Sequence, residues 1–510
     1  MRTLFGRGAR GRVASLAFGA CLLAVPVMAA SCSDKNKDED PAPTLDRSAL
    51  LDPESCKNCH VNHYEQWSGS MHAYASDDPV FLAMNARGQR ETNGQLGDFC
   101  VKCHAPMAVH ENATKDGLNL DTVPAPLKGV TCFFCHSVDT IQGLHNAQLT
   151  LAGDLVLRGE YADPVKNSAH RATYSPLHDG DRIESANLCG SCHDIENGHG
   201  TKIERTFEEW QASVFAHVPT GNTCGQCHMS QSINLEPIAQ NTPGVFSRHT
   251  HEHTLHGVDT ALTPFPQADV QRTKVQEFLD SSIQSALCAT VASGITSVRV
   301  IADNVRAGHG LPSGSAQDRR LWAEVVGYAG NTKIFESGVV PDGAAATKNP
   351  DTDPANYWLM RDCMFDQPGP GGKEVHMFWE AGDYEGNALP AKVTSDPLDP
   401  LFYKSHVIRK YPDNGGGFAG IADRITLRIR LRAMDRDVLD ELVDSHDLDP
   451  AVRDAIPTLD IGGTLTWTAA TATGVYIEPE TRRAFNCITQ TNLNLKSDST
   501  PAPRRTRCSP

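Results

Sequence analysis

The chain has 510 residues, a formal net charge of −16 and 40% hydrophobic residues. This length is too great for one small domain. The acidic balance argues against nucleic acid as a partner, because nucleic-acid-binding proteins present a basic face. It favours small molecules, or proteins with basic patches, as partners.

Residues 1–31 have the features of a secretory signal peptide. Four arginines precede an apolar run over residues 13–30: Arg2, Arg7, Arg10 and Arg12. A basic start followed by an apolar segment is typical of export signals. The run ends in Ala29-Ala30-Ser31-Cys32, which is similar to a bacterial lipobox. We therefore predict that Cys32 is lipidated, with membrane affinity set by burial of its acyl chains. The alternative is ordinary cleavage near Ala30, which would give a soluble periplasmic protein.

Residues 32–52 are polar and acidic and contain Pro41 and Pro43. This composition predicts a disordered tether between the lipid site and the first domain. No later run in the sequence is long and apolar enough to span a bilayer. The sequence thus predicts an exported bacterial protein, either periplasmic or an outer-membrane lipoprotein, with the cell surface as a further option.

The pattern Cys-x-x-Cys-His occurs five times between Cys56 and His228. It is the attachment pattern for c-type haem, in which two thiols bond to one porphyrin and the adjacent histidine lies under the iron. The predicted attachment cysteines are Cys56, Cys59, Cys100, Cys103, Cys132, Cys135, Cys189, Cys192, Cys224 and Cys227. The predicted proximal iron ligands are His60, His104, His136, His193 and His228. The predicted cofactors are therefore five covalently bound c-type haems, held by a domain over residues 53–260.

Structural zinc and a disulfide knot are the alternatives to haem. Zinc sites built from Cys-x-x-Cys units need pairs of units, and five motifs do not pair. Neither alternative explains a histidine directly after the second cysteine of every motif.

The sixth ligand of each iron decides what that iron does, because a second histidine closes it and an open position leaves room for a small molecule. Twelve further histidines lie between His63 and His256: His63, His72, His110, His145, His170, His178, His199, His217, His249, His251, His253 and His256. The sequence therefore has ample candidates for closing all the irons.

A helical connector and a β-rich domain are predicted after the motifs. Apolar residues at helical spacing between Val270 and Leu287 predict a helix within a connector over residues 261–294, or the last helix of the haem domain. Alternation from Ile425 to Arg432 predicts a strand with one wet face. Weaker strands are predicted over 297–301, 321–328, 333–335 and 464–467. We predict a β-sandwich-like domain over 295–495, interrupted by a helix over 436–443, and a tail over 496–510. The fold class is α+β, with a mainly α and irregular pentahaem domain first.

Four cysteines lie outside the motifs, the signal and the lipid site: Cys288, Cys363, Cys487 and Cys508. An even number in an exported chain predicts disulfides, and the three alternative pairings stay open.

The motif region resembles the cytochrome c-554 and hydroxylamine-oxidoreductase-like multihaem cytochromes. The matching pieces are Cys56–His60 leading to Trp67, Ser70 and His72; Gly129–His136; His170 followed by Tyr174–Leu177; Cys189–Asp194; and Glu209–Trp210 leading to Thr223–Met229. The resemblance implies packed haems whose distal histidines come from remote segments. It favours His72 and His170, together with His253 or His256 from the run over 248–256. His145 and His178 complete the predicted distal ligands, with His110 as an alternative.

Residues 307–314, followed by 319–322, look like a C-terminal module that accompanies such cytochromes. Within it, His309 either faces a haem across the domain junction or, as we favour, is a turn histidine satisfied by backbone. The chain has no Cys-x-x-Cys-Lys motif, and it has fewer motifs than the hydroxylamine oxidoreductases. These departures weaken the expectation of catalysis, and no catalytic residue is predicted.

The predicted function is electron relay in the cell envelope between redox protein partners, with Cys32 as the membrane anchor and no nucleic acid partner. One alternative is a reductase or oxidase of a small nitrogen or sulfur compound with one open haem. Another is a subunit of a larger extracellular conduit, as a homo- or hetero-oligomer.

Overall fold

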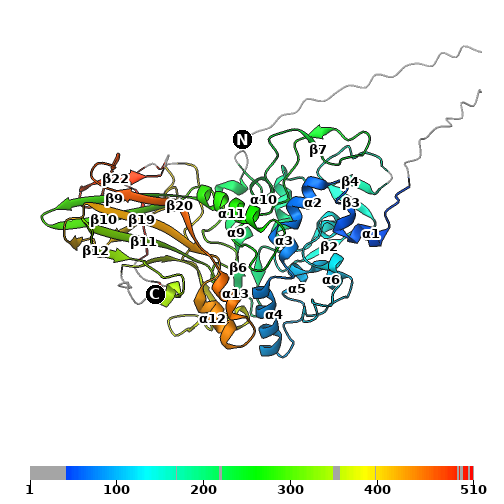
Figure 1. Ribbon diagram of the computed structural model, residues 1–510, viewed down its shortest axis with the longest axis horizontal. Coiled ribbons are helices and arrows are strands. Elements are labelled where there is room, and N and C mark those ends of the chain that lie inside the picture. The colour runs from blue at the N-terminus through cyan, green and yellow to red at the C-terminus, as the bar shows by residue number, and fades with distance from the viewer. Residues whose placement is uncertain are drawn as a thin grey trace, which may run out of the picture. The chain divides into compact units, whose positions relative to one another are not determined.

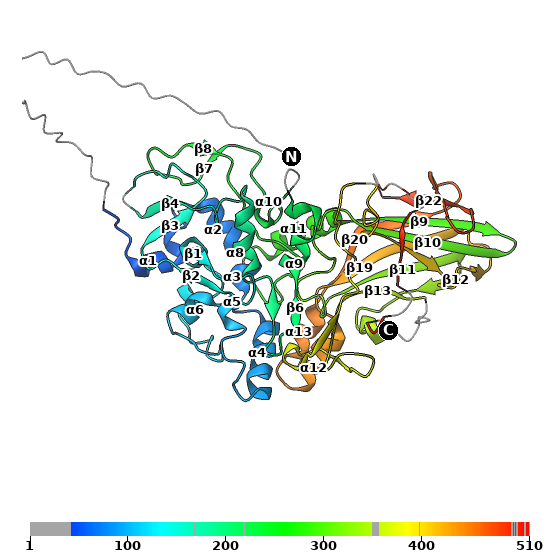
Figure 2. The same ribbon diagram turned by 180° about the vertical axis from the view of Figure 1, so that it is seen from behind.

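The computed structural model describes residues 42–508, except 168, 218–220, 349–355, 397, 491–492, 494, 496–497 and 504–505. The predicted signal peptide, Cys32 and the start of the tether lie outside these residues. Figures 1 and 2 show the described part from opposite sides, with short helices towards one end and long strands towards the other. The α+β class is confirmed.

Short helices and two-stranded ribbons make up the motif region. The helices are α1 (Arg47–Leu51), η1 (Pro53–Ser55), α2 (Val61–Ser68), α3 (Met71–Tyr74), α4 (Pro79–Glu91), α5 (Val101–His104), α6 (Pro106–His110), η2 (Ala125–Leu127), α7 (Cys132–Ser137), η3 (Ile183–Ser185), α8 (Ala186–Gly190), α9 (Thr206–Gln211), η4 (Val214–Ala216) and α10 (Cys224–His228). The ribbons pair β1 (Val138–Ile141) with β2 (Leu149–Leu151), β3 (Val156–Gly159) with β4 (Arg171–Tyr174), β5 (Ile195–Glu196) with β6 (Lys202–Glu204), and β7 (Glu236–Pro237) with β8 (Ser247–Arg248).

Helix α1 lies inside the stretch predicted to be a disordered tether. Asp46 begins the helix by accepting a hydrogen bond from the Ala49 amide (2.9 Å), as an N-cap does. Leu50 is buried in a cluster with Phe81 and Val101. The tether prediction is therefore wrong for residues 47–51, because a cap and an apolar side chain fix this segment.

The predicted connector helix is present as α11 (Ala268–Ser282) and is followed at once by strand β9 (Ile283–Ala292). Ile283 and Leu287, which were counted on the helical face, are buried in the strand. The helical connector is thus wrong for residues 283–292. Pairing of β9 with β10 (Ile295–Asn304) along their whole length overrides the helical spacing of these apolar residues.

Two larger sheets form the β-rich part. One has the order β21 (Gly474–Ile477), β22 (Ala484–Thr489), β9, β10, β17 (His406–Tyr411), β23 (Thr500–Pro501), with β18 (Phe418–Ala419) on β10. The other has the order β12 (Thr332–Ser337), β11 (Arg320–Ala329), β19 (Arg424–Arg432), β20 (Thr458–Trp467), with β13 (Trp358–Met360) on β11. Val298 and Val300 of the first sheet and Val325, Leu427 and Ile429 of the second share one buried cluster. The sheets therefore pack face to face, as in a sandwich.

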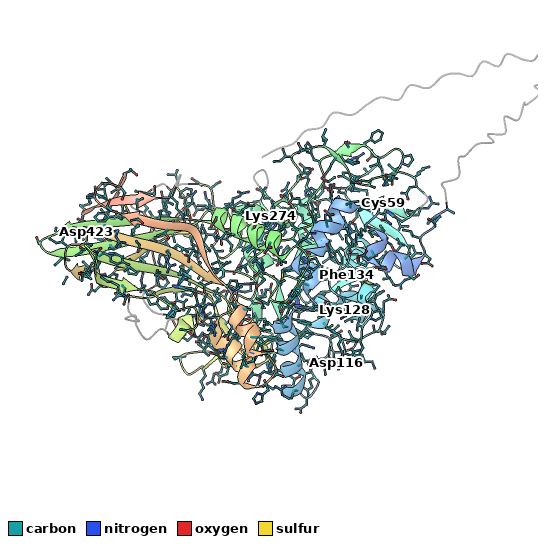
Figure 3. The ribbon with its side chains drawn as sticks, in the orientation of Figure 1. Cys59, Asp116, Lys128, Phe134, Lys274 and Asp423 are labelled. Atoms are coloured by element: carbon teal, nitrogen blue, oxygen red, sulfur yellow. A yellow bond between two sulfur atoms is a disulfide. The ribbon has the colours of Figure 1, made fainter. Side chains whose placement is uncertain are left out.

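Smaller elements complete this part. They are a three-stranded sheet of β15 (Glu374–Val375), β14 (Cys363–Phe365) and β16 (Asp383–Glu385), the helices α12 (Arg436–Asp444) and α13 (Pro450–Ala455), and the 3-10 turns η5 (Ala346–Lys348) and η6 (Phe378–Glu380). Helix α12 confirms the helix predicted over 436–443. Figure 3 labels Asp423 among the long strands, Lys274 on α11, and Cys59 and Phe134 in the motif region.

The last residues are not a free tail. Strand β23 pairs in parallel with β17, and Cys508 is fully buried in a disulfide with Cys363. A second disulfide joins Cys288 of β9 to Cys487 of β22. These two bonds settle the pairing that the sequence left open, and the predicted tail is wrong for residues 500–503 and 506–508.

In the part of the chain that the structure describes, no helix combines the length and the apolar character needed to cross a bilayer.

The two faces of β19 differ in burial, which gives a test of the sandwich. Leu427 points into the core with 1% of its surface exposed, whereas its neighbour Thr426 is half-buried. Leu427→Ala should lower the free energy of unfolding by about 2–5 kcal/mol, because it leaves a cavity in a packed core. Thr426→Ala should cost less than about 1 kcal/mol. Denaturant unfolding followed by far-UV circular dichroism measures both, and equal losses would contradict the assigned faces.

Candidate functional site

The five motifs lie at short helices and tight turns, and local capping fixes two of them. Thr131 directly precedes Cys132 and accepts a hydrogen bond from the Phe134 amide, so α7 begins at the motif. Thr223 and Gln226 form a capping box that begins α10 at Cys224. A capped start sets the first helical turn, which brings the two cysteines of a motif to the same side. All ten motif cysteines are free of disulfides.

Each motif histidine is oriented by an acceptor from a remote segment. Four imidazoles donate through Nδ1 to main-chain carbonyls: His60 to Ile238 (2.8 Å), His104 to Ala75 (3.0 Å), His136 to Arg158 (2.5 Å) and His228 to His256 (2.8 Å). The Nδ1 of His193 lies 3.7 Å from a carboxylate oxygen of Glu204. A hydrogen bond at Nδ1 fixes the tautomer whose Nε2 can bind a metal.

Second histidine rings lie opposite four of the motif histidines. A ring bound through Nε2 has its centre about 3 Å from the metal, so two rings on one iron have centres about 6 Å apart. The observed separations from ring centre to ring centre are 6.2 Å for His60 and His170, 6.4 Å for His136 and His253, 6.1 Å for His193 and His72, and 6.4 Å for His228 and His309. These spacings fit one iron between each pair.

His60 has two histidine neighbours, of which His170 is the better counterpart. The His63 ring lies 6.3 Å from the His60 ring, but it follows three residues later on the same helical turn. Residues at that spacing lie on one helix face, so they do not approach an iron from opposite sides. His170 comes from a remote segment, and its Nδ1 is bonded to the Arg171 carbonyl (3.1 Å), which leaves Nε2 free.

His136 also has two neighbours, His178 at 5.8 Å and His253 at 6.4 Å between ring centres. His178 uses its Nε2 to bond the Cys135 carbonyl (2.7 Å). His253 bonds the His251 carbonyl through Nδ1 (3.0 Å), in the same manner as the motif histidines. His253 thus leaves Nε2 free as the motif histidines do and is the counterpart we choose, whereas His178 leaves its buried Nδ1 without a partner.

His309 is the candidate that sequence reasoning did not commit to. Its Nδ1 bonds the Gly310 carbonyl (2.8 Å), so it is the backbone-satisfied turn histidine that the sequence favoured. The same ring also lies against His228, with 10° between the planes. The sequence feature that could have indicated His309 as a ligand is its place between two glycines in the segment 307–314.

His104 differs from the other four. Among the described residues, the ring that contacts it is Phe81, stacked at 4.0 Å with 4° between the planes. In the described chain, no ring contact joins the predicted ligands His145 and His256 to a motif histidine, and His256 meets His228 through its carbonyl instead. His145 is half-buried with its Nε2 3.0 Å from the Gln148 amide, and the His256 ring packs on Phe278. The alternative His110 lies beside Glu111.

Burial keeps most of these imidazoles neutral. It lowers the pKa of His72 to about 3, and that of His178 and His228 to about 4. Neutral imidazole is the form that binds a metal. His193 is the exception: burial lowers its pKa, but the hydrogen bond and charge of Glu204 outweigh this effect and raise it to about 9. Glu204 therefore adds electron density to this ligand.

Thiols of different motifs contact one another. Cys132 lowers the pKa of the Cys56 thiol, Cys192 raises that of Cys103, and Cys224 lowers that of Cys189, so these thiols lie near one another. Burial, followed by the nearby Cys192 and Cys189 thiols, raises the pKa of the Cys135 thiol to about 12. These thiols would become thioethers on attachment of haem, so neighbouring motifs would hold their haems through sulfurs that lie near one another.

The residues present fit c-type haem. The free thiol pairs, the fixed tautomers and the opposed rings are the donor set that such a haem requires. Bound haem supplies one-electron redox chemistry at its iron, and the chain orients the ligands, excludes water from them and keeps their imidazoles neutral.

Comparisons with known proteins agree with this donor set. The family model described as cytochrome c554 and c-prime matches residues 55–137, which hold the first three motifs. The structure is similar to that of a penta-heme cytochrome c552 from Thermochromatium tepidum, with a TM-score of 0.54 and 18% identity over 82% of this chain and 99% of that one. A comparison with curated proteins found no match.

Single replacements of histidine test the ring pairs. His72→Ala, His170→Ala, His253→Ala and His309→Ala should each convert one low-spin haem to high spin, because each removes a sixth ligand. His145→Ala and His256→Ala should leave the spin states unchanged. Electron paramagnetic resonance of the purified full chain counts the change. A new high-spin haem in His178→Ala, with none in His253→Ala, would reverse the choice at His136.

Glu204→Gln tests the carboxylate beside His193. Loss of the negative charge makes the imidazole a poorer donor to ferric iron, so one haem should shift to a more positive potential. A tenfold change in the redox equilibrium corresponds to about 59 mV for one electron, and we expect a shift of that order or less. Spectroelectrochemical titration measures it, with Glu196→Gln on the paired strand as control. A shift equal to that of the control would remove Glu204 from this role.

Proposed function

We propose that this multihaem c-type cytochrome carries five haems and relays electrons among them. The observation that carries the proposal is the presence of a second histidine ring opposite four of the five motif histidines. Two histidines close an iron against substrates and leave it suited to electron transfer. Orienting bonds at Nδ1 hold most of these ligands in place, and His72, whose Nδ1 is buried without a hydrogen-bond partner, is the exception among the described residues.

The thiol contacts support one connected relay. The motif at 56–60 meets that at 132–136 through Cys56 and Cys132, and the motif at 189–193 meets that at 224–228 through Cys189 and Cys224. Cys135 lies beside Cys189 and Cys192 and joins these halves. The motif at 100–104 branches from 189–193 through Cys103 and Cys192. The branch therefore ends at His104, the motif histidine that has no histidine ring opposite it among the residues that the structure describes.

The proposed setting is the cell envelope. The predicted signal peptide supports export, and lipidation of Cys32 would hold the relay at a membrane. The net charge of −16 supports redox partners with basic docking patches. Homo- or hetero-oligomers in a larger conduit are compatible with this setting.

A second function is proposed for the haem at His104. Here Phe81, instead of an imidazole, is the ring against the motif histidine in the described chain. An iron without a sixth protein ligand binds small molecules. This position suits reduction or oxidation of a small nitrogen or sulfur compound, with the other four haems supplying or removing electrons.

Carbon monoxide distinguishes the two functions. We expect the purified full chain to accept five electrons in a reductive titration and to bind one equivalent of carbon monoxide, at the haem of His104. The variant Cys100→Ser/Cys103→Ser should lose that haem and the carbon monoxide site together, as haem content and difference spectra would show. If no carbon monoxide binds, the open haem at His104 is refuted and only the electron relay remains. Binding at two or more haems would refute the proposed ligand pairs.

A further inference from the structure

The loop that carries His309 belongs to the β-rich part of the chain. It follows β10 and precedes β11, and its β-side contacts are made by the backbone. Leu311 and Leu389 exchange main-chain hydrogen bonds of 2.8 and 2.9 Å, and the Asn304 side chain donates to the His309 carbonyl (2.7 Å). His228, which the His309 ring faces, belongs to the motif region. The ring pair therefore spans two parts of the fold.

Side chains of helix α9, in the motif region, form hydrogen bonds with the same loop. A single carboxylate oxygen of Glu209 accepts hydrogen bonds from the Gly310 amide (2.9 Å) and the Ser313 hydroxyl (2.8 Å). One turn earlier, the Thr206 hydroxyl accepts from the Gly314 amide (2.9 Å) and bonds Ser313 (3.0 Å). These contacts hold the loop on both sides of Leu311 and Pro312.

Gly310 links Glu209 directly to the ligand. Its carbonyl accepts from the His309 Nδ1, and its amide donates to Glu209. A Cβ on Gly310 would lie 3.0 Å from a Glu209 oxygen, so the approach of the carboxylate depends on glycine here. Displacement of Glu209 would therefore be passed to the imidazole through one residue.

The second carboxylate oxygen of Glu209 faces an arginine. Arg205 lies 3.7 Å from its second oxygen and 3.6 Å from Asp362 of the β-rich part. Burial, and then the charge of Asp362, raise the pKa of Glu209 to about 7. A neutral amide at this position is thus a close substitute that keeps an oxygen acceptor.

We propose that Glu209 is a positioning residue for the haem attached at Cys224 and Cys227, holding the loop of the β-rich part so that His309 can close the iron. The inference rests on the proposed ligation by His309. It makes the axial ligation of this haem depend on a contact between the motif region and the β-rich part.

The test compares four variants of the haem-loaded full chain. His309→Ala should open one haem completely. Glu209→Ala should raise the five-coordinate population of the same haem by about tenfold or more, because it removes two hydrogen bonds from the loop. Glu209→Gln should restore the low-spin state through its amide oxygen. Glu208→Ala is the matched control, because this neighbour on the same helix is exposed and pairs with Lys202.

Spin state by electron paramagnetic resonance and the extra equivalent of carbon monoxide are the readouts, with haem content and far-UV circular dichroism as checks of folding. If His309→Ala opens a haem and Glu209→Ala behaves like Glu208→Ala, the positioning role is refuted and the ligation stands. If His309→Ala opens none, both fail, although a relay through the other haems could remain.

Ser313→Ala decides the question if Glu209→Ala does not fold. It removes one of the two hydrogen bonds to Glu209 and leaves the charge in place. Carbon monoxide should then bind the haem of His228 several-fold faster than in the parent chain. An unchanged rate would overturn the proposal.

Discussion

The hydrogen bond from an imidazole Nδ1 to a remote acceptor is the interaction on which the motif region depends. The acceptors for His60, His104, His136 and His228 come from residues far along the chain, such as Ile238 and Ala75. Three of these bonds tie a motif to a segment outside the helices and strands, at Ile238, Ala75 and His256, and the fourth ties one to Arg158 in the short strand β3. The same hydrogen bond fixes both partners: it holds the segment that supplies the acceptor, and it orients the imidazole that donates. This mutual dependence explains how so few long helices support so many sites.

The β-rich part is stabilised in a different way. Its sheets bury a continuous apolar core through residues such as Val300 and Leu427, so it is stable by ordinary sandwich packing. One disulfide joins the neighbouring strands β9 and β22, and the other joins Cys508 to Cys363 of β14. Such a rigid body is well suited to present one loop accurately. The loop between β10 and β11, which carries the proposed ligand His309, is thus presented by the packed sandwich.

Local patterns in the sequence were sufficient for the motifs, the strand at 425–432 and the helix at 436–443. They failed where distant pairing decides the outcome. Ile283 and Leu287 have helical spacing, yet they form a strand because β10 lies beside them. The same limit applies to the distal histidines. His72 and His170 were proposed from resemblance, but nothing near His309 in sequence indicates His228, since the two meet only when both parts of the fold are assembled.

The division of one haem site between two parts of the chain has a consequence for biosynthesis. Cys224 and Cys227 precede the strands that present His309, so they are synthesised first. Under the proposed ligation, a haem attached at that stage would have its proximal imidazole and no ligand from the later segment. Closing of this iron would then report that the sandwich has formed and docked. The spin state of the last haem in sequence order would thus indicate whether the β-rich part has folded and docked.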